Sequence, residues 1–168
     1  VYSKEMEHDA CGVGLIASTE GKKSREVVEY GIEALKAVWH RGAVDADGKT
    51  GDGAGIHLEI PKDFFVEKIE VTGHTHDGSD ICVGMIFLPR NDYAAQESCK
   101  TIVESELTKN DFSIYGWRQV PVNPKVLGEK ALQTMPEIIQ VLFKANNKNL
   151  LDKDLERKIY ETRKKIEN

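Results

Sequence analysis

The sequence predicts an α/β domain, and three observations support this class. The 168 residues suit a single domain, which would bury roughly 70% of the surface that the unfolded chain exposes. Apolar runs typical of strands alternate with segments that have helical apolar spacing. The strands differ in character: residues 56–60 place His57 and Glu59 on one face, whereas residues 81–88 are apolar throughout. The alternation of strands and helices favours a parallel sheet, whereas the difference in character between the strands favours a mixed or antiparallel sheet. Both arrangements remain open.

Residues 1–10 are polar without periodicity and are expected to form a leader before the domain at 11–168. Residues 11–17 are predicted to form a strand, because apolar residues follow Cys11. Ser24 is predicted to cap a helix. Its apolar positions are Val28, Ile32, Leu35 and Trp39. Residues 41–55 are too rich in glycine for either element, and long ordered loops are usually functional.

The second half of the chain repeats this alternation. Residues 56–60 predict a strand, and Pro61 suits the first turn of the helix that follows. Residues 81–88 predict a buried strand, and Asn91 or Asp92 is expected to cap a helix in which Cys99 faces the core. Strands are expected at 112–122 and 137–144, with a short helix over 125–133 between them. A final helix from Asp152 is expected to form i,i+4 ion pairs. These pairs are Asp154 with Lys158 and Glu161 with Lys165.

Composition excludes several classes of function. A net charge of −5 argues against nucleic acid or an anionic membrane as a partner. The longest apolar run, residues 81–88, is too short to cross a bilayer. The three cysteines are widely spaced and form no Cys-x-x-Cys pair, which argues against a disulfide framework or a zinc site. A reduced, cytoplasmic location is therefore expected.

Cys11 stands at the head of its predicted strand between Ala10 and Gly12, which are too small to shield it. The thiol is a candidate nucleophile, and the alternative is a small buried hydrophobe. Arg41 follows the first helix and is able to hold a carboxylate or carbonyl group. The alternative for Arg41 is a cation favoured by the helix dipole.

Two further motifs have a functional and a structural interpretation. Residues 51–55 resemble a glycine-rich phosphate cradle but match neither nucleotide-binding spacing, which favours a close-packed turn. His74 and His76, with Asp77 and Asp80, are potential metal ligands. A solvated loop is the alternative, because no further ligand has suitable spacing.

Several motifs together resemble the class II glutamine amidotransferase domain of glutamate synthases. They are DACGVG at 9–14, HRGA at 40–43, TGDGAGI at 50–56, FLPR at 87–90, GWRQVPV at 116–122, LG at 127–128, PEIIQ at 136–140 and ERKIY at 156–160. The resemblance covers nearly the whole chain. It implies a four-layer αββα N-terminal-nucleophile hydrolase, in which two stacked sheets lie between helical layers.

The resemblance also implies an activity, the hydrolysis of L-glutamine to glutamate and ammonia. Cys11 would be the nucleophile and its own α-amino group the base, so residues 1–10 would be a propeptide cut after Ala10. Arg41 and Gly42 would shape the substrate pocket, and Gly12 would leave room for the substrate amide.

The sequence departs from the family in lacking two segments. One is the Arg-Phe-Ser-Thr-Asn segment that holds the glutamine carboxylate, and the other is the His-Asn-Gly-Glu segment that forms the oxyanion hole. The chain is therefore expected to be an inactive fragment of a longer polypeptide. FMN and an iron–sulfur cluster are implied for the rest of that polypeptide and none for this segment, with a small reductase subunit or ferredoxin as electron donor.

Two other functions remain open. A non-catalytic module would keep the amidotransferase fold and bind a partner. An unrelated cysteine hydrolase would need a histidine beside Cys11, for which the sequence gives no support. The available histidines are His8, His40, His57, His74 and His76.

Overall fold

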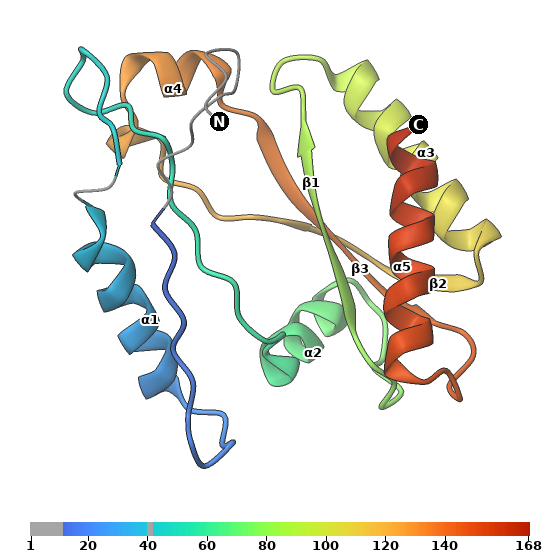
Figure 1. The fold of residues 1–168 in the computed structure, drawn as a ribbon. Helices are drawn as coiled ribbons and strands as arrows, with labels where there is room; N and C mark the ends of the chain where they lie inside the picture. Colours follow the sequence, from blue (N-terminus) through green and yellow to red (C-terminus); the bar gives the residue numbers. More distant parts are fainter. Residues whose placement is uncertain (1–11, 40–41) are drawn as a thin grey trace, which may run out of the picture. The chain divides into compact units, whose positions relative to one another are not determined.

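The computed structural model describes residues 12–39 and 42–168 (Figure 1). The chain divides into unit 1, Val1–Glu59 with Asn123–Thr134, and unit 2, Ile60–Val122 with Met135–Asn168. Unit 1 contains α1 (Arg25–Ala37), the 3-10 turn η2 (Pro124–Val126) and α4 (Glu129–Thr134). Unit 2 contains α2 (Lys62–Val71), β1 (Cys82–Leu88), α3 (Tyr93–Lys109), β2 (Phe112–Gln119), β3 (Glu137–Ala145) and α5 (Asp152–Glu167).

Unit 2 is built on a three-stranded antiparallel sheet in the order β1-β3-β2. In the central strand, Gln140 lies opposite Met85 of β1 and Val141 lies opposite Trp117 of β2. The α/β class is confirmed, and the parallel alternative is wrong. Both outer strands run antiparallel to β3 and so share one direction. The helix α3 connects them, which explains why the sequence alternates as a parallel sheet does.

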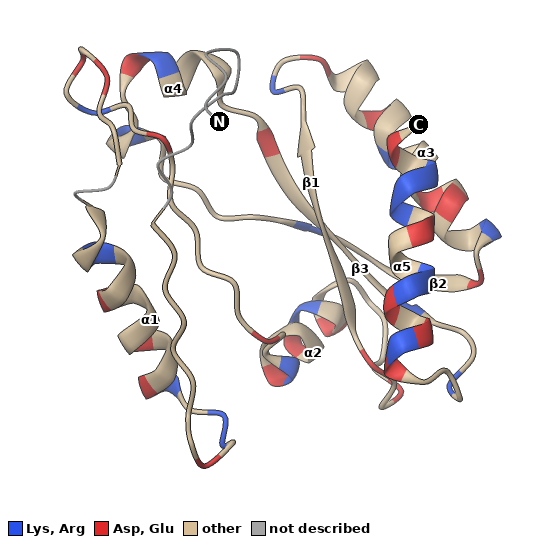
Figure 2. Ribbon diagram, in the orientation of Figure 1, with Lys and Arg blue, Asp and Glu red and all other residues tan. Residues whose placement is uncertain are grey.

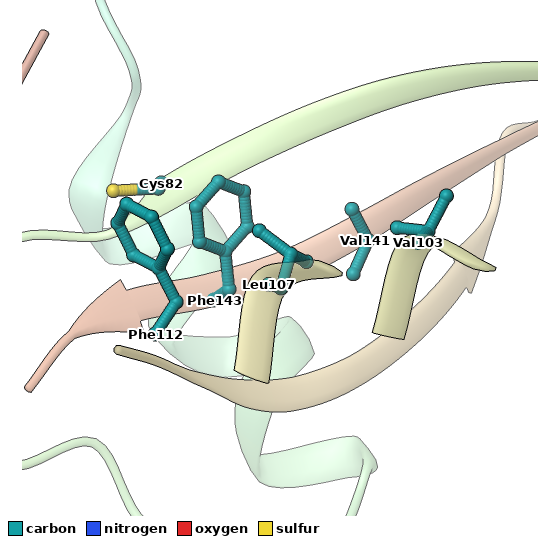
Figure 3. Close-up of a cluster of buried hydrophobic side chains, with 6 residues drawn as sticks. All are labelled: Cys82, Val103, Leu107, Phe112, Val141 and Phe143. Atoms are coloured by element: carbon teal, nitrogen blue, oxygen red, sulfur yellow. The ribbon is translucent and has the colours of Figure 1, made fainter. Parts of the chain in front are cut away.

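One face of the sheet carries the larger hydrophobic cluster, which α3 covers (Figure 3). The buried members are Cys82, Val103, Leu107, Phe112, Val141 and Phe143. The rings of Phe112 and Phe143 meet edge to face, with centroids 5.2 Å apart. The apolar side of α5 packs against the margin of this cluster through Leu155, Ile159 and Ile166, as its spacing predicts.

The opposite face of the sheet packs against α2. Leu142 lies between two residues of the first cluster and points the other way, because successive side chains of a strand alternate. It is fully buried, at 0% exposure, against Phe65 and Ile69 of α2 and Tyr115 of β2. The central strand therefore supports a cluster on each face.

Two helices begin where the sequence predicts. The Ser24 side chain accepts a hydrogen bond from the Val27 N–H at 3.3 Å, and Asp92 accepts one from the Ala95 N–H at 2.9 Å. Each side chain satisfies a backbone donor that has no partner inside its helix. Cys99 on α3 is only half-buried and belongs to neither cluster, so its predicted place in the core is wrong.

Two predicted strands are not found. Residues 12–17 and 56–60 are assigned no strand, and Val13 and Leu15 are 91% and 89% exposed. A strand needs a neighbour to pair its backbone groups, and the described part of the chain provides none for these segments. Cys11, the predicted head of the first strand, lies outside the described residues.

Three other expectations need correction. The helix predicted over 125–133 is two elements, η2 and α4, because Leu127 is extended between them with ψ of 148°. The far end of β1 is not buried on both faces, since Phe87 is 64% exposed. The ion pairs predicted within α5 do not form.

The charged residues of α5 find other partners, and both signs of charge lie along this helix (Figure 2). Lys158 pairs with Asp111 at 3.3 Å, and Lys165 bonds to Asn110 at 2.6 Å. Both partners follow α3, whereas Glu161 pairs within α5 with Arg157 at 2.9 Å, so a different i,i+4 pair forms from the one predicted. Among the described residues, no helix combines the length and apolar character needed to cross a membrane.

Asp77 anchors the loop between α2 and β1 to the end of the sheet. Its Oδ2 lies 2.8 Å from Lys144 Nζ and 3.0 Å from Lys148 Nζ, and its Oδ1 accepts a hydrogen bond from the Tyr115 hydroxyl at 3.3 Å. Hydrogen bonds from Lys144, Ser79 and Lys148, in decreasing order of effect, hold the pKa of Asp77 well below its usual range. The loop is thus held by an ionised carboxylate.

Replacing Leu142 by Ala should lower the free energy of unfolding by about 2–5 kcal/mol, because it leaves a cavity between the sheet and α2. Urea unfolding followed by circular dichroism measures the loss. Leu151→Ala is the control, since Leu151 is 72% exposed and its truncation should change stability by less than about 0.5 kcal/mol. Equal losses in the two variants would contradict this account of the core.

The Asp77 contacts should make stability depend on pH in acid. A carboxyl whose pKa is lowered in the folded state stabilises the fold above its unfolded pKa of about 3.9, and this contribution is lost as pH falls below that value. The urea midpoint of the wild type should therefore fall more between about pH 5 and pH 2 than that of Asp77→Asn. Glu70→Gln is the control, because Glu70 is exposed and has no ion pair among the described residues. Parallel pH profiles for wild type and Asp77→Asn would refute the assignment.

Candidate active site

The structure describes two of the four predicted site residues. Cys11 and Arg41 lie outside the described residues, whereas Gly12 and Gly42 lie within unit 1 and are exposed. Within the described chain, no hydrogen bond joins Gly12 to Gly42. The geometry of the site is therefore that of the loop that starts at Gly42.

Gly42 begins a loop that closes on itself. Its N–H donates to the Trp39 carbonyl at 3.0 Å, and among the described residues a Cβ added to Gly42 would meet that carbonyl oxygen at 3.4 Å. Val44 and Gly51 form an antiparallel bridge, and the Asp45 N–H donates to the Thr50 carbonyl at 2.8 Å. The loop thus has a hydrogen-bonded base.

Carboxylates fill the interior of this loop. Asp52 Oδ2 accepts the Ala43 N–H at 2.9 Å. Asp47 Oδ1 accepts the N–H groups of Lys49 and Thr50 at 2.9 and 2.7 Å, and its Oδ2 accepts the Thr50 hydroxyl at 2.5 Å. That hydroxyl, followed by the two N–H groups, holds the pKa of Asp47 well below its usual range. The N–H groups of Ala43, Lys49 and Thr50 therefore donate to the loop's own carboxylates.

The segment at 128–130 lies against this loop. Lys130 Nζ lies 2.5 Å from Asp45 Oδ2. A Cβ on Gly128 would overlap Thr50 Oγ1, Asp47 Oδ2 and the Thr50 nitrogen. The sequence analysis did not identify these contacts. The Asp-Gly-x-Thr pattern at 47–50 signals the turn itself, but nothing local in the sequence predicts its partner 80 residues later.

The candidate metal ligands have other roles. His76 Nε2 lies 2.8 Å from the Ser79 carbonyl oxygen, His74 Nδ1 lies 3.1 Å from Thr72 Oγ1, and Asp77 pairs with two lysines. Across residues 12–39 and 42–168, no three His, Cys, Asp or Glu residues gather as a metal site would require. These contacts favour the structural interpretation of this loop.

Cys82 is unsuited to nucleophilic chemistry. It is buried in the larger cluster, and burial, with smaller effects of Asp80 and Glu156, raises its pKa to about 12. Such a thiol stays protonated at neutral pH. The polar side chains of the loop at 42–55 are three carboxylates, the Lys49 amine and the Thr50 hydroxyl, which already donates to Asp47.

Comparison of the sequence with known proteins identifies the family of this chain. Residues 11–168 match the family of class II glutamine amidotransferases. The chain is 55% identical over 166 residues to the glutamate synthase (NADPH) large chain of Azospirillum brasilense, covering 99% of this chain and 11% of that protein. It is 42% identical over 162 residues to ferredoxin-dependent glutamate synthase 1 of Arabidopsis thaliana, covering 96% and 10% respectively.

A further relative is the ferredoxin-dependent glutamate synthase of Pyropia yezoensis, 41% identical over 169 residues, with 99% of this chain and 11% of that protein covered. The chain spans about a tenth of the length of these curated relatives. The resemblance drawn from the motifs is confirmed, because the match runs through the whole domain predicted at 11–168. The chain belongs to the class II glutamine amidotransferase family.

Proposed function

We propose that this chain is the glutaminase portion of a glutamate synthase, which hydrolyses L-glutamine and supplies ammonia to 2-oxoglutarate bound elsewhere on the same polypeptide. The observation that carries the proposal is the family match over residues 11–168, which begins at Cys11 itself. Residues 1–10 lie outside that match. This supports a leader removed before Cys11 acts.

The proposed chemistry depends on the N-terminal position of Cys11. Its α-amine takes the proton of the thiol, and this transfer is nearly balanced because an α-amine and a cysteine thiol ordinarily have pKa values of about 8 and about 8.5. The sulfur bonds to the side-chain carbonyl carbon of glutamine, the carbon–nitrogen bond breaks, and the α-ammonium returns the proton to the departing ammonia. Water then adds to the thioester carbon, and cleavage of the carbon–sulfur bond releases glutamate and the thiol.

Three other residues would form the pocket around this sulfur. Gly12 leaves space for the substrate amide, and Arg41 with Gly42 borders the substrate. The closed base of the loop that begins at Gly42 supports this role, because a binding loop needs a fixed frame. The roles of Cys11 and Arg41 rest on the family match and on their motifs.

The proposed cofactors belong to the rest of the polypeptide. FMN and an iron–sulfur cluster would carry electrons to 2-oxoglutarate there, from a small reductase subunit or ferredoxin. Cys82 and Cys99 are the free thiols of the described residues, and they form no group of ligands that could hold a cluster. A cluster therefore does not fit the described part of this chain. The cytoplasmic location stays a prediction.

Labelling of the full-length polypeptide tests the nucleophile. A glutamine-analogue diazoketone should form an adduct on Cys11, and mass spectrometry should show Cys11 as the first residue of the mature chain. Cys11→Ala should lower glutamine-dependent ammonia release by several orders of magnitude. Cys99→Ser is the matched control and should keep both activity and labelling. An active Cys11→Ala variant, or an active enzyme that still begins at Val1, would refute the proposal.

The missing segments predict a second result. The 168-residue chain, processed to begin at Cys11, should release ammonia more than about 10³-fold more slowly than the full-length polypeptide, since loss of even one oxyanion donor reduces the rate about 10²- to 10³-fold. Steady-state ammonia release at saturating glutamine compares the two proteins. Equal rates would show that residues 11–168 contain the complete site.

A further inference from the structure

Two segments of unit 1 that lie far apart in the sequence meet at the loop behind Gly42. Lys130, in the first turn of α4, pairs with Asp45 at 2.5 Å. Beside this pair, the turn at 47–50 lies so close to Gly128 that no side chain fits between them. Since Gly128 has no positive φ, this glycine is required by space and not by backbone conformation.

The turn that rests on Gly128 is already rigid by itself. Asp47 accepts three hydrogen bonds from Lys49 and Thr50, at 2.5 to 2.9 Å. A displacement at Gly128 must therefore move the turn as a body. Both Asp47 and Thr50 would shift together.

A chain of hydrogen bonds and one β-bridge connects this turn to the residue next to Gly42. Thr50 accepts the Asp45 N–H, the next residues form the bridge between Val44 and Gly51, and Asp52 accepts the N–H of Ala43. Ala43 adjoins Gly42, so three successive polar contacts connect the turn to the pocket residue. These contacts are exposed and bury little apolar surface, which leaves the position of the loop dependent on its support at 128–130.

We propose that Gly128 and Lys130 are positioning residues for glutamine binding, because they fix the loop at 42–55 and through it the place of Gly42. The inference rests on the proposed glutaminase function. Neither residue takes part in the bond changes at Cys11. Their alteration should therefore raise the KM for glutamine and leave kcat nearly unchanged, a separation that general unfolding would not produce.

Gly128→Ala in the full-length polypeptide is the first test. The added methyl group should push the turn away and raise the KM for glutamine by about tenfold, with kcat within about threefold of wild type. Val126→Ala is the matched control, because Val126 lies two residues from Gly128, outside the 42–55 loop, and is 67% exposed. That variant should keep the wild-type KM.

A charge exchange is the second test. Lys130→Asp and Asp45→Lys should each raise the KM by about threefold, the size expected when the side chains of Lys130 and Asp45 are 68% and 33% exposed. The double variant, in which the charges are exchanged, should recover most of the wild-type KM. High salt should reduce the difference between wild type and the single variants.

The outcomes separate this inference from the proposed function. If the wild type releases no ammonia from glutamine, the proposed function fails and the inference fails with it. If the wild type is active and Gly128→Ala and the charge variants keep its KM, only the inference is overturned. A fall in kcat with unchanged KM, or a lowered melting temperature with equal losses in both constants, would show a structural role and also overturn it.

Discussion

The packing of β3 between two hydrophobic clusters is the constraint on which unit 2 depends. Every pairing of the sheet involves this strand, and its residues Val141, Leu142 and Phe143 point alternately to the two faces. The clusters are therefore coupled, because a shift of one residue in the register of β3 would exchange the residues that face α3 and α2. Burial on both faces fixes this register, and the bulge between Ile114 and Gly116 adapts β2 to it.

Unit 1 is held together by different physics. Its helix α1 has no fully buried residue, and the loop at 42–55 is fixed by carboxylates that accept hydrogen bonds from N–H and hydroxyl groups. Contacts of this kind define geometry closely but add little stability when they are exposed.

The cysteines illustrate how environment selects a nucleophile. Cys82 lies in the core, where burial raises its pKa to about 12 and keeps the thiol protonated. An attacking sulfur needs the opposite environment, an accessible position with a base of matched pKa beside it. In the proposed mechanism Cys11 obtains that base from its own backbone nitrogen. His74 and His76 contact the 72–79 loop of unit 2.

The sequence by itself determined the features that depend on neighbouring residues. It was possible to identify the caps at Ser24 and Asp92, the strands of the sheet and the family motifs, because capping and apolar periodicity act over a few residues. The same periodicity wrongly predicted strands at 12–17 and 56–60, since a strand also requires a partner for its backbone.

Tertiary structure decided how distant segments combine. It placed β3 between β1 and β2, paired Lys158 with Asp111 in place of Asp154, and brought Lys130 to Asp45. No local pattern contains this information, because these contacts form only when burial of the two clusters and closure of the loop bring the chain segments together. The same distinction applies to the candidate site. Its motifs could be recognised from neighbouring residues, whereas the contacts that hold its loop come from a distant segment of the chain.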